Sequence, residues 1–453
     1  MPSSSNRHAV ILAAGKGTRF KSAKSKVLHE VCGRPMITYL LDRLPDLDID
    51  RVFVVVDNES GQIREALQEY PVEFIVQEEQ LGTGHAIMCT TERIGTLSGI
   101  LLVLYGDTPF ISTENLTKLL ETCEETGCDE SLLTTELSCP TGYGRILRNI
   151  DGSPADIIEE KEATGDQKKI TEINAGFACF RIESLVSNIA KLSNENNTGE
   201  YYLTDMVKIL DNAGKKVQAV KVPAEEEIFG INDRIQLAAA EKQLQKKITM
   251  EMMAAGVSIP QPENVQIHST VKIGPDSVVY PGAVLEGNCH IGKSCTIGPN
   301  VHLLNAVIED RTNIENGSSV FNSHIGWGCT VGPCARLRDQ AVIGNNARIG
   351  NFVEIKNSII GEGTIAAHLT YLGDAEIGRE VNIGAGTVTC NFDGVKKNRT
   401  IIEDNAFIGS NAQLIAPVRI GRGATVAAGS TVTDDVPAGK MAIARSRQTN
   451  RER

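Results

Sequence analysis

Aliphatic side chains recur at every sixth position through a long C-terminal stretch of the chain, from about Val265 to Val432. Three separate runs keep this period, and glycine or another small residue often follows the aliphatic one; the runs are Ile267, Ile273, Val279, Leu285, Ile291, Ile297 and Leu303, then Ile325, Val331, Leu337, Ile343, Ile349 and Ile355, then Ile408, Leu414, Ile420, Val426 and Val432. A period of six fits neither an α-helix nor one long alternating strand. It is typical of the hexapeptide repeats of a parallel β-helix, whose coils bury their faces by stacking on each other. At three hexads per coil, roughly 170 residues predict about nine or ten coils.

The N-terminal half shows a different pattern, in which short apolar runs alternate with helical periodicity. The apolar runs predict strands, and the segments between them predict helices: strands at Ala9–Ala13, Arg51–Val56, Glu73–Gln77 and Gly99–Leu104, and helices such as Pro35–Leu44 and Gly61–Glu69. This alternation favours a Rossmann-like α/β domain, a parallel sheet with helices on both faces. Ligands of such sheets bind at the carboxyl ends of the strands.

A polar stretch without glycine or proline separates the two patterns. It predicts one long helix over Arg234–Ala254, ended by Gly256. We therefore expect three parts: an N-terminal domain over residues 1–233, a helical linker over 234–255 and a hexapeptide-repeat domain over 256–453.

Composition narrows the functional classes. The chain has 453 residues and a formal net charge of -12, which argues against nucleic acid or an anionic membrane as a general partner. Its eleven cysteines include no C-x-x-C pair, as expected for reduced thiols rather than a disulfide framework or a zinc site. The apolar run near the N-terminus is too short for a signal peptide or a membrane span. These features predict a cytoplasmic protein.

The first predicted strand ends in a glycine-rich turn, Leu12-Ala13-Ala14-Gly15-Lys16-Gly17-Thr18-Arg19, which Lys26 follows. It matches neither a Walker A loop nor the dinucleotide-binding G-x-G-x-x-G. Small residues let a phosphate or a base approach the backbone, and Arg19 and Lys26 supply positive charge; a purely structural turn is the alternative. Asp107 likewise follows an apolar strand, where a carboxylate can hold Mg²⁺ against phosphate oxygens or cap a turn before Pro109.

The hexad period breaks at Cys390–Arg399, a basic segment that we expect to leave the solenoid as an exposed loop. It is either a ligand clamp or a tolerated insertion. His368 lies shortly before it and is a candidate general base, although a lone histidine is more often structural. Arg338 and Lys356 are 18 residues, one coil length, apart and would stack into a phosphate-binding column, whereas His290, His302 and His324 have no such setting.

Four motifs in the N-terminal half resemble the signature of sugar-1-phosphate nucleotidyltransferases. They are Leu12–Arg19 with Lys26-Val27-Leu28, Gln77–Ala86, Leu104-Tyr-Gly-Asp-Thr-Pro109 and Thr141-Gly-Tyr-Gly-Arg145. With the hexad array behind them, the whole chain resembles the bacterial family of bifunctional N-acetylglucosamine-1-phosphate uridylyltransferases/glucosamine-1-phosphate N-acetyltransferases. The resemblance implies transfer of acetyl from acetyl-CoA to glucosamine 1-phosphate, followed by transfer of UMP from UTP to the product. The resulting UDP-N-acetylglucosamine would serve peptidoglycan and lipopolysaccharide synthesis.

For the N-terminal domain, the resemblance implies that Mg²⁺ is held by Asp107 and Asn232, and that Arg19 and Lys26 are catalytic. It assigns UTP and the sugar nucleotide to Leu12, Ala13, Ala14, Gly15, Lys26, Gln77, Gly82, Thr83, Tyr105, Gly106, Asp107, Gly144, Glu159, Asn174 and Asn232. Glu160 adjoins Glu159, and motif register alone decides between them.

For the C-terminal domain, the resemblance implies a left-handed coil, a homotrimer and His368 as the base. It assigns the amino sugar phosphate to Arg338, Lys356, Tyr371 and Asn382, and acetyl-CoA to Ala385, Asn391, Phe392, Ser410, Ala428 and Arg445. Phe392 departs from the family's usual tyrosine and lacks its phenolic hydroxyl. The competing hypotheses are a nucleotidyltransferase with a single activity and a structural or regulatory β-helix, and a binding subunit without catalysis; retention of Arg19, Lys26 and Asp107 argues against the latter.

Overall fold

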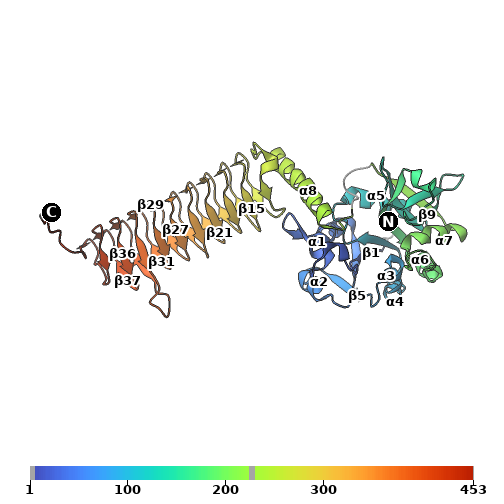
Figure 1. Cartoon of the computed structure of the whole chain (residues 1–453), viewed down its shortest axis with the longest axis horizontal. Coiled ribbons are helices and arrows are strands. Elements are labelled where there is room, and N and C mark those ends of the chain that lie inside the picture. Colours follow the sequence, from blue (N-terminus) through green and yellow to red (C-terminus); the bar gives the residue numbers. More distant parts are fainter. Residues whose placement is uncertain (1–5, 224–229, 452–453) are drawn as a thin grey trace, which may run out of the picture. The chain divides into compact units, whose positions relative to one another are not determined.

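The computed structural model describes residues 6–223 and 230–451. The chain forms two compact units, Met1–Ala240 and Glu241–Arg453, and the division falls inside helix α8 (Arg234–Ala254) (Figure 1). This helix has the bounds expected from the sequence. Gly256, just after it, has a φ of 95°, the left-handed conformation that commonly ends a helix.

A seven-strand path forms the centre of the first unit, in the order β11-β7-β10-β6-β1-β4-β5. Their bounds are Arg7–Leu12 (β1), Ile49–Val56 (β4), Val72–Val76 (β5), Ile100–Tyr105 (β6), Glu130–Glu136 (β7), Glu172–Arg181 (β10) and Val217–Lys221 (β11). Strands β1, β4, β5 and β6 are parallel, as predicted. The expectation of an entirely parallel sheet was wrong, because β10 runs antiparallel to both β6 and β7. A hairpin of β8 (Arg145–Arg148) and β9 (Pro154–Ile158) precedes β10 in the chain and pairs with it through β8.

Successive residues of the strands point to opposite sides of this sheet, and helices bury both sides. Leu102 and Leu104 of β6 pack with α1 (Met36–Leu41), α2 (Gly61–Ala66) and α5 (Thr113–Thr126). Leu101 and Val103 pack with the helices of the other face, which are α3 (Thr83–Met88), α4 (Thr91–Ile94), α6 (Ile182–Asn188) and α7 (Met206–Asn212). The layered α/β prediction is therefore confirmed, with element ends displaced by no more than three residues.

The second unit is a parallel β-helix, in which each short strand pairs with the third strand along the chain. It contains three parallel sheets, of ten, nine and ten strands, that run from β12 (Gln266–Ile267) to β40 (Met441–Ala442) (Figure 1). This agrees with the predicted nine or ten coils. The aliphatic residues of all three hexad runs are buried except Ile273, which is half-buried in the first coil.

The strands that carry the candidate site belong to two of these sheets. One sheet contains β24 (Arg336–Arg338), β27 (Glu354–Lys356), β30 (Tyr371–Gly373) and β33 (Val388–Cys390); the other contains β26 (Arg348–Asn351), β29 (Ile365–His368), β32 (Asn382–Ile383), β35 (Phe407–Ile408) and β38 (Thr425–Val426). The segment between β33 and β34 (Thr400–Ile402) projects from the solenoid as a loop (Figure 1). Phe392 and Val395 on it are 60% and 90% exposed, which confirms that the hexad break marks an exposed loop.

Candidate functional sites

Glycine positions bring the loop after β1 close to neighbouring segments. Gly17 has a φ of 55°, and a Cβ built on it would lie 2.9 Å from Lys26 Cβ. A Cβ on Gly106 would lie 2.9 Å from Val27 Cγ1. Two short 3-10 helices, Thr18–Phe20 and Lys26–Leu28, present Arg19 and Lys26. The absence of side chains at the two glycines therefore lets both cations lie beside the carboxyl ends of β1 and β6.

Four predicted residues from distant parts of the sequence meet here. Lys26 Nζ donates to Asp107 Oδ2 and lies 2.8 Å from Asn232 Oδ1. Arg19 Nη2 lies 3.1 Å from the same Asn232 oxygen. One carboxylate and one amide oxygen are hard ligands suited to Mg²⁺, which usually takes its remaining ligands from phosphates and water. In the part of the chain that the structure describes, no group of three histidine, cysteine or acidic side chains could hold a metal by itself.

The predicted base-binding residues lie on the same edge of the sheet. Gln77 is 3% exposed, and its Nε2 donates to Gly82 O at 3.1 Å. Gly82 has a φ of 106°, and a Cβ there would lie 2.6 Å from Tyr201 O. Thr83 Oγ1 accepts a hydrogen bond from the Leu203 amide at 3.1 Å. These contacts give the segment a fixed backbone, which a ring bound against it requires.

The residues predicted to bind the sugar converge beside the β8–β9 hairpin. The backbone N–H of Asn174 donates to Gly144 O at 2.9 Å, and Glu159 Oε1 accepts from Thr204 Oγ1 at 3.0 Å. Burial raises the pKa of the Glu159 carboxyl. Tyr105 and Asn174 line one cavity together with Thr204. Apolar side chains make up most of the rest of this lining, and Glu159 and Gly144 are not part of it.

Glu160, the neighbour of Glu159, has a different role. Its Oε2 lies 2.7 Å from Nη2 of Arg145, which is only 1% exposed, and it also accepts from the Gly142 amide at 3.3 Å. The pair fixes the start of β8 against the end of β9. Sequence reasoning missed this ion pair, although Arg145 lies in the Thr141–Arg145 motif and Glu160 was considered there as the alternative to Glu159.

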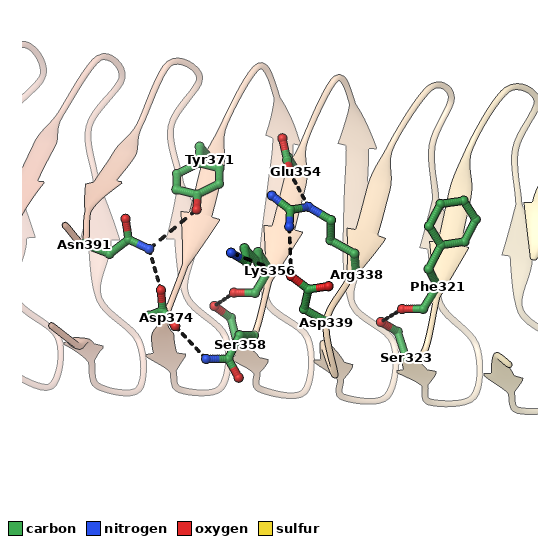
Figure 2. A network of polar contacts seen from close by, with 11 residues as sticks. Phe321, Ser323, Arg338, Asp339, Glu354, Lys356, Ser358, Tyr371, Asp374 and Asn391 are labelled. Atoms are coloured by element: carbon green, nitrogen blue, oxygen red, sulfur yellow. Dashed lines mark hydrogen bonds and ion pairs between the residues drawn. The ribbon is translucent and has the colours of Figure 1, made fainter. Parts of the chain in front are cut away.

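The second cluster lies on the solenoid, where Arg338 and Lys356 are direct neighbours across β24 and β27. Figure 2 shows both cations on one face, with Asp339 between them. Arg338 Nε lies 2.7 Å from Glu354 Oε1, and its Nη1 lies 2.8 Å from Asp339 Oδ2. Lys356 Nζ is 3.6 Å from that Asp339 oxygen. The two cations therefore stack in a column, as the coil spacing predicts, and carboxylates balance its charge. Phosphate binding by this column stays a prediction.

A carboxylate links this column to the exposed loop. Asp374 Oδ2 accepts from Asn391 Nδ2 at 2.5 Å, and the same Nδ2 lies 3.5 Å from Tyr371 Oη (Figure 2). Lys397 of the loop joins Lys356 in lining a cavity of about 450 Å³, and the nearby Lys356 ammonium lowers the pKa of Lys397. Lys397 was not among the predicted site residues, although it lies in the basic segment that the hexad break marked.

His368 belongs to a vertical row of residues on the other sheet. Strand pairing aligns Arg348, Ile365, Asn382, Phe407 and Thr425. The residue three positions after each forms the row Asn351, His368, Ala385, Ser410 and Ala428. Three of the predicted acetyl-CoA residues thus stack beyond His368, and their small side chains leave room for a ligand chain along the row. Arg445 adjoins its end, since Nη1 donates to Ala428 O at 2.8 Å.

Two predicted residues stand apart from these clusters. Asn382 pairs with Ile365 and Phe407, and within residues 230–451 no hydrogen bond connects its side chain to the Arg338–Lys356–Tyr371 group. Phe392 extends into solvent on the loop. A single chain therefore does not bring all the predicted acetyltransferase residues together.

Known protein families match both halves of the chain. The MobA-like NTP transferase domain matches residues 9–150. The GMPPB C-terminal domain matches residues 262–360, and the bacterial transferase hexapeptide (six repeats) matches residues 399–434. The hexapeptide match agrees with the left-handed form of the β-helix expected from the resemblance. A solved structure of CMP:2-keto-3-deoxy-manno-octonic acid synthetase with CTP covers 54% of this chain, at 17% identity and a TM-score of 0.42, which is too low to indicate a shared fold.

Whole-length relatives give a more specific result. The chain is 48% identical over 446 residues to the "Bifunctional protein GlmU" of Geobacillus thermodenitrificans, covering 98% of this chain and 97% of the relative. It is 47% identical over 444 residues to that of Acetivibrio thermocellus (98% and 96%) and 44% identical over 448 residues to that of Halalkalibacterium halodurans (99% and 98%). Identity at this level over nearly the full length of both partners shows that the chain belongs to the GlmU family of bifunctional uridylyltransferase/acetyltransferase enzymes.

Proposed function

We propose that the two activities reside in separate sites, uridylyl transfer at the Arg19–Lys26–Asp107–Asn232 cluster and acetyl transfer on the solenoid, with Arg338, Lys356 and His368. The observation that carries this proposal is that each compact unit holds its own set of candidate residues. The four residues of the first unit contact one another, and the second unit carries the paired cations Arg338 and Lys356 and, on another sheet, His368. The substrates are small molecules: UTP, acetyl-CoA, glucosamine 1-phosphate and N-acetylglucosamine 1-phosphate.

In the uridylyltransferase site, a phosphate oxygen of N-acetylglucosamine 1-phosphate attacks the α-phosphorus of UTP, and pyrophosphate leaves. The sugar phosphate is already a nucleophile, so no covalent intermediate is needed. Arg19 and Lys26 offset the negative charge of the phosphates. Mg²⁺ between Asp107 and Asn232 would supply further charge neutralisation at the phosphates. Lys26 donates to both of those oxygens and Arg19 to that of Asn232, so the cations lie beside the position proposed for the metal.

In the acetyltransferase site, the His368 imidazole takes a proton from the 2-ammonium group of glucosamine 1-phosphate. The free amine then attacks the thioester carbonyl of acetyl-CoA and the C–S bond breaks. The CoA thiolate takes the proton that His368 holds and leaves as the thiol, and the new amide nitrogen loses its extra proton to solvent. Lys356 and Lys397 line a cavity of about 450 Å³, large enough for a sugar phosphate, and Arg338 is the strand neighbour of Lys356. The row of Ala385, Ser410 and Ala428 gives the acetyl-bearing chain a path to His368. The N-acetylated product is the sugar substrate of the other site.

We also propose a homotrimer built through the β-helix. The separation of Asn382 from the other sugar-phosphate residues supports it, because a neighbouring copy can supply the missing group. Val342 and Ile359, neighbours on one sheet of the solenoid, are 38% and 51% exposed and would be covered in such an assembly.

Across residues 6–223 and 230–451, no helix combines the length and apolarity that a bilayer crossing requires. All eleven cysteines are free, which supports placing the reactions in the reducing cytoplasm.

The Asp107→Asn variant tests the metal assignment. It keeps the shape of the side chain and removes the charge that a metal between Asp107 and Asn232 requires. We expect pyrophosphate release from UTP and N-acetylglucosamine 1-phosphate to fall by about 10²-fold or more, the scale of several kcal/mol. Half-saturation should also need more Mg²⁺, while CoA release from acetyl-CoA stays unchanged. Wild-type Mg²⁺ dependence in this variant would rule out the metal assignment.

A further inference from the structure

Asn351 lies directly against the ring of His368. Its side-chain Oδ1 is 2.6 Å from His368 Nδ1, and the two residues are opposite each other in the pairing of β26 with β29. We propose that Asn351 is a positioning residue that orients the His368 imidazole and fixes its tautomer for acetyl transfer. This inference rests on the proposed role of His368 as the general base.

The backbone around the pair holds it in place. A Cβ built on Gly350 would lie 1.8 Å from Ala367 O, so glycine is required for the two coils to approach this closely. The Leu369 amide donates to Asn351 O at 2.9 Å, and Thr370 Oγ1 donates to His368 O at 2.7 Å. These contacts hold the backbones of Asn351 and His368 next to each other, and so they fix the Asn351 side chain relative to the imidazole.

The chemistry of an amide oxygen determines the tautomer. Oδ1 can only accept a hydrogen bond, so the proton of the neutral imidazole lies on Nδ1 and the lone pair lies on Nε2. A general base needs that lone pair directed at the proton it removes. Asn351 therefore leaves the far nitrogen of His368 free to act.

The partner of His368 distinguishes it from other histidines of the solenoid. His302 Nε2 lies 2.7 Å from Glu286 Oε2, and His324 Nε2 lies 2.9 Å from Glu309 Oε1. Among the described side chains, none that carries a charge forms a hydrogen bond or ion pair with the His368 ring. A neutral amide oxygen is therefore the group that orients this ring.

The experiment compares two substitutions at Asn351 in the full-length protein. Asn351→Leu keeps the volume and removes the acceptor. We expect kcat for acetyl transfer to fall about 10- to 100-fold, the loss typical when a functional histidine loses its hydrogen-bond partner, with KM for both substrates unchanged. Asn351→Asp keeps an acceptor and adds a charge, so kcat should recover at higher pH, with the rising limb of the pH–rate profile displaced upward. Asn313→Leu, an equivalent exchange on the same sheet, is the matched control and should behave as wild type.

Three results would overturn the inference: an unchanged kcat in Asn351→Leu, a loss that appears in KM, or an unshifted profile in Asn351→Asp. If Asn351→Leu fails to fold, the profile of Asn351→Asp decides alone. His368→Ala separates this inference from the function it rests on. If that variant retains acetyl transfer, the base assignment and this inference both fail. If it loses activity while Asn351→Leu keeps full kcat, only the positioning role fails.

Discussion

Gly350→Ala should disable the acetyltransferase site without touching a substrate-binding side chain. The new Cβ would lie 1.8 Å from Ala367 O, and real Cβ contacts essentially never fall below 3.0 Å, so the two coils must separate locally by about 1.2 Å. That displacement would stretch the 2.9 Å hydrogen bond from Leu369 N to Asn351 O beyond its effective range. Overpacking costs about 1–3 kcal/mol and the lost hydrogen bond about 1 kcal/mol. We therefore expect the free energy of unfolding to fall by about 2–4 kcal/mol.

The assay measures CoA release and pyrophosphate release on the same preparation, with thermal unfolding beside them. A displacement of about 1 Å at a catalytic group can cost about 100-fold, so acetyl transfer should fall on that scale and uridylyl transfer should not change. Gly423→Ala is the control, because nothing lies within 4 Å of its Cβ and it meets only the strain of a φ of 63°. Full acetyl transfer and an unchanged melting temperature in Gly350→Ala would refute the close-approach argument.

Two further predictions concern the first unit. Burial, with Asp156 and Glu159 nearby, raises the pKa of Asp205 to about 6. A carboxyl with a raised folded-state pKa contributes its full stability below its unfolded value and loses it as pH rises through the folded value. Allowing for partial exposure, Asp205→Asn should stabilise the first unit by about 1 kcal/mol at pH 7.5 and little at pH 4. Calorimetry measures this on the unfolding transition that UTP shifts, and an equal gain at both pH values would contradict the prediction. Lys26→Met should let the nucleotide-free protein bind Mn²⁺ more tightly in calorimetric titration, because Lys26 competes for Asp107 and Asn232; affinity equal to that of wild type, or the same gain in Lys24→Met, would contradict competition.

The hexad period was the strongest structural signal, because it records burial directly. Each aliphatic residue of a run points into the solenoid, so its spacing predicted the coils, and the interruption at Cys390–Arg399 predicted the loop. The strand pattern of the first unit predicted the parallel strands β1, β4, β5 and β6 and made no prediction for β7, β10 or β11. It could not show that β10 runs antiparallel, because direction depends on the connections between strands and not on the apolarity of a strand.

The sites divide in the same way. Arg338 and Lys356 were predictable as neighbours because one coil separates them. Lys397 and the Arg145–Glu160 pair were not, because each depends on side-chain direction or on where an irregular loop folds back. Spacing along the sequence carries no information about either. The contact of Asn351 with His368 was missed, although their separation of 17 positions is close to one coil length. Asn382 is the opposite case. Its place in the motif predicted that it joins the other sugar-phosphate residues, and within one chain it does not.

The most direct test of the two-site account measures both half-reactions in two variants of the whole protein. Free thiol from acetyl-CoA with glucosamine 1-phosphate reports one site, and pyrophosphate from UTP with supplied N-acetylglucosamine 1-phosphate reports the other. Arg19→Ala should abolish pyrophosphate release and keep thiol release near wild type. His368→Ala should lower thiol release by about 10²–10⁴-fold and leave pyrophosphate release unchanged. A large loss of both activities in either folded variant would contradict the account.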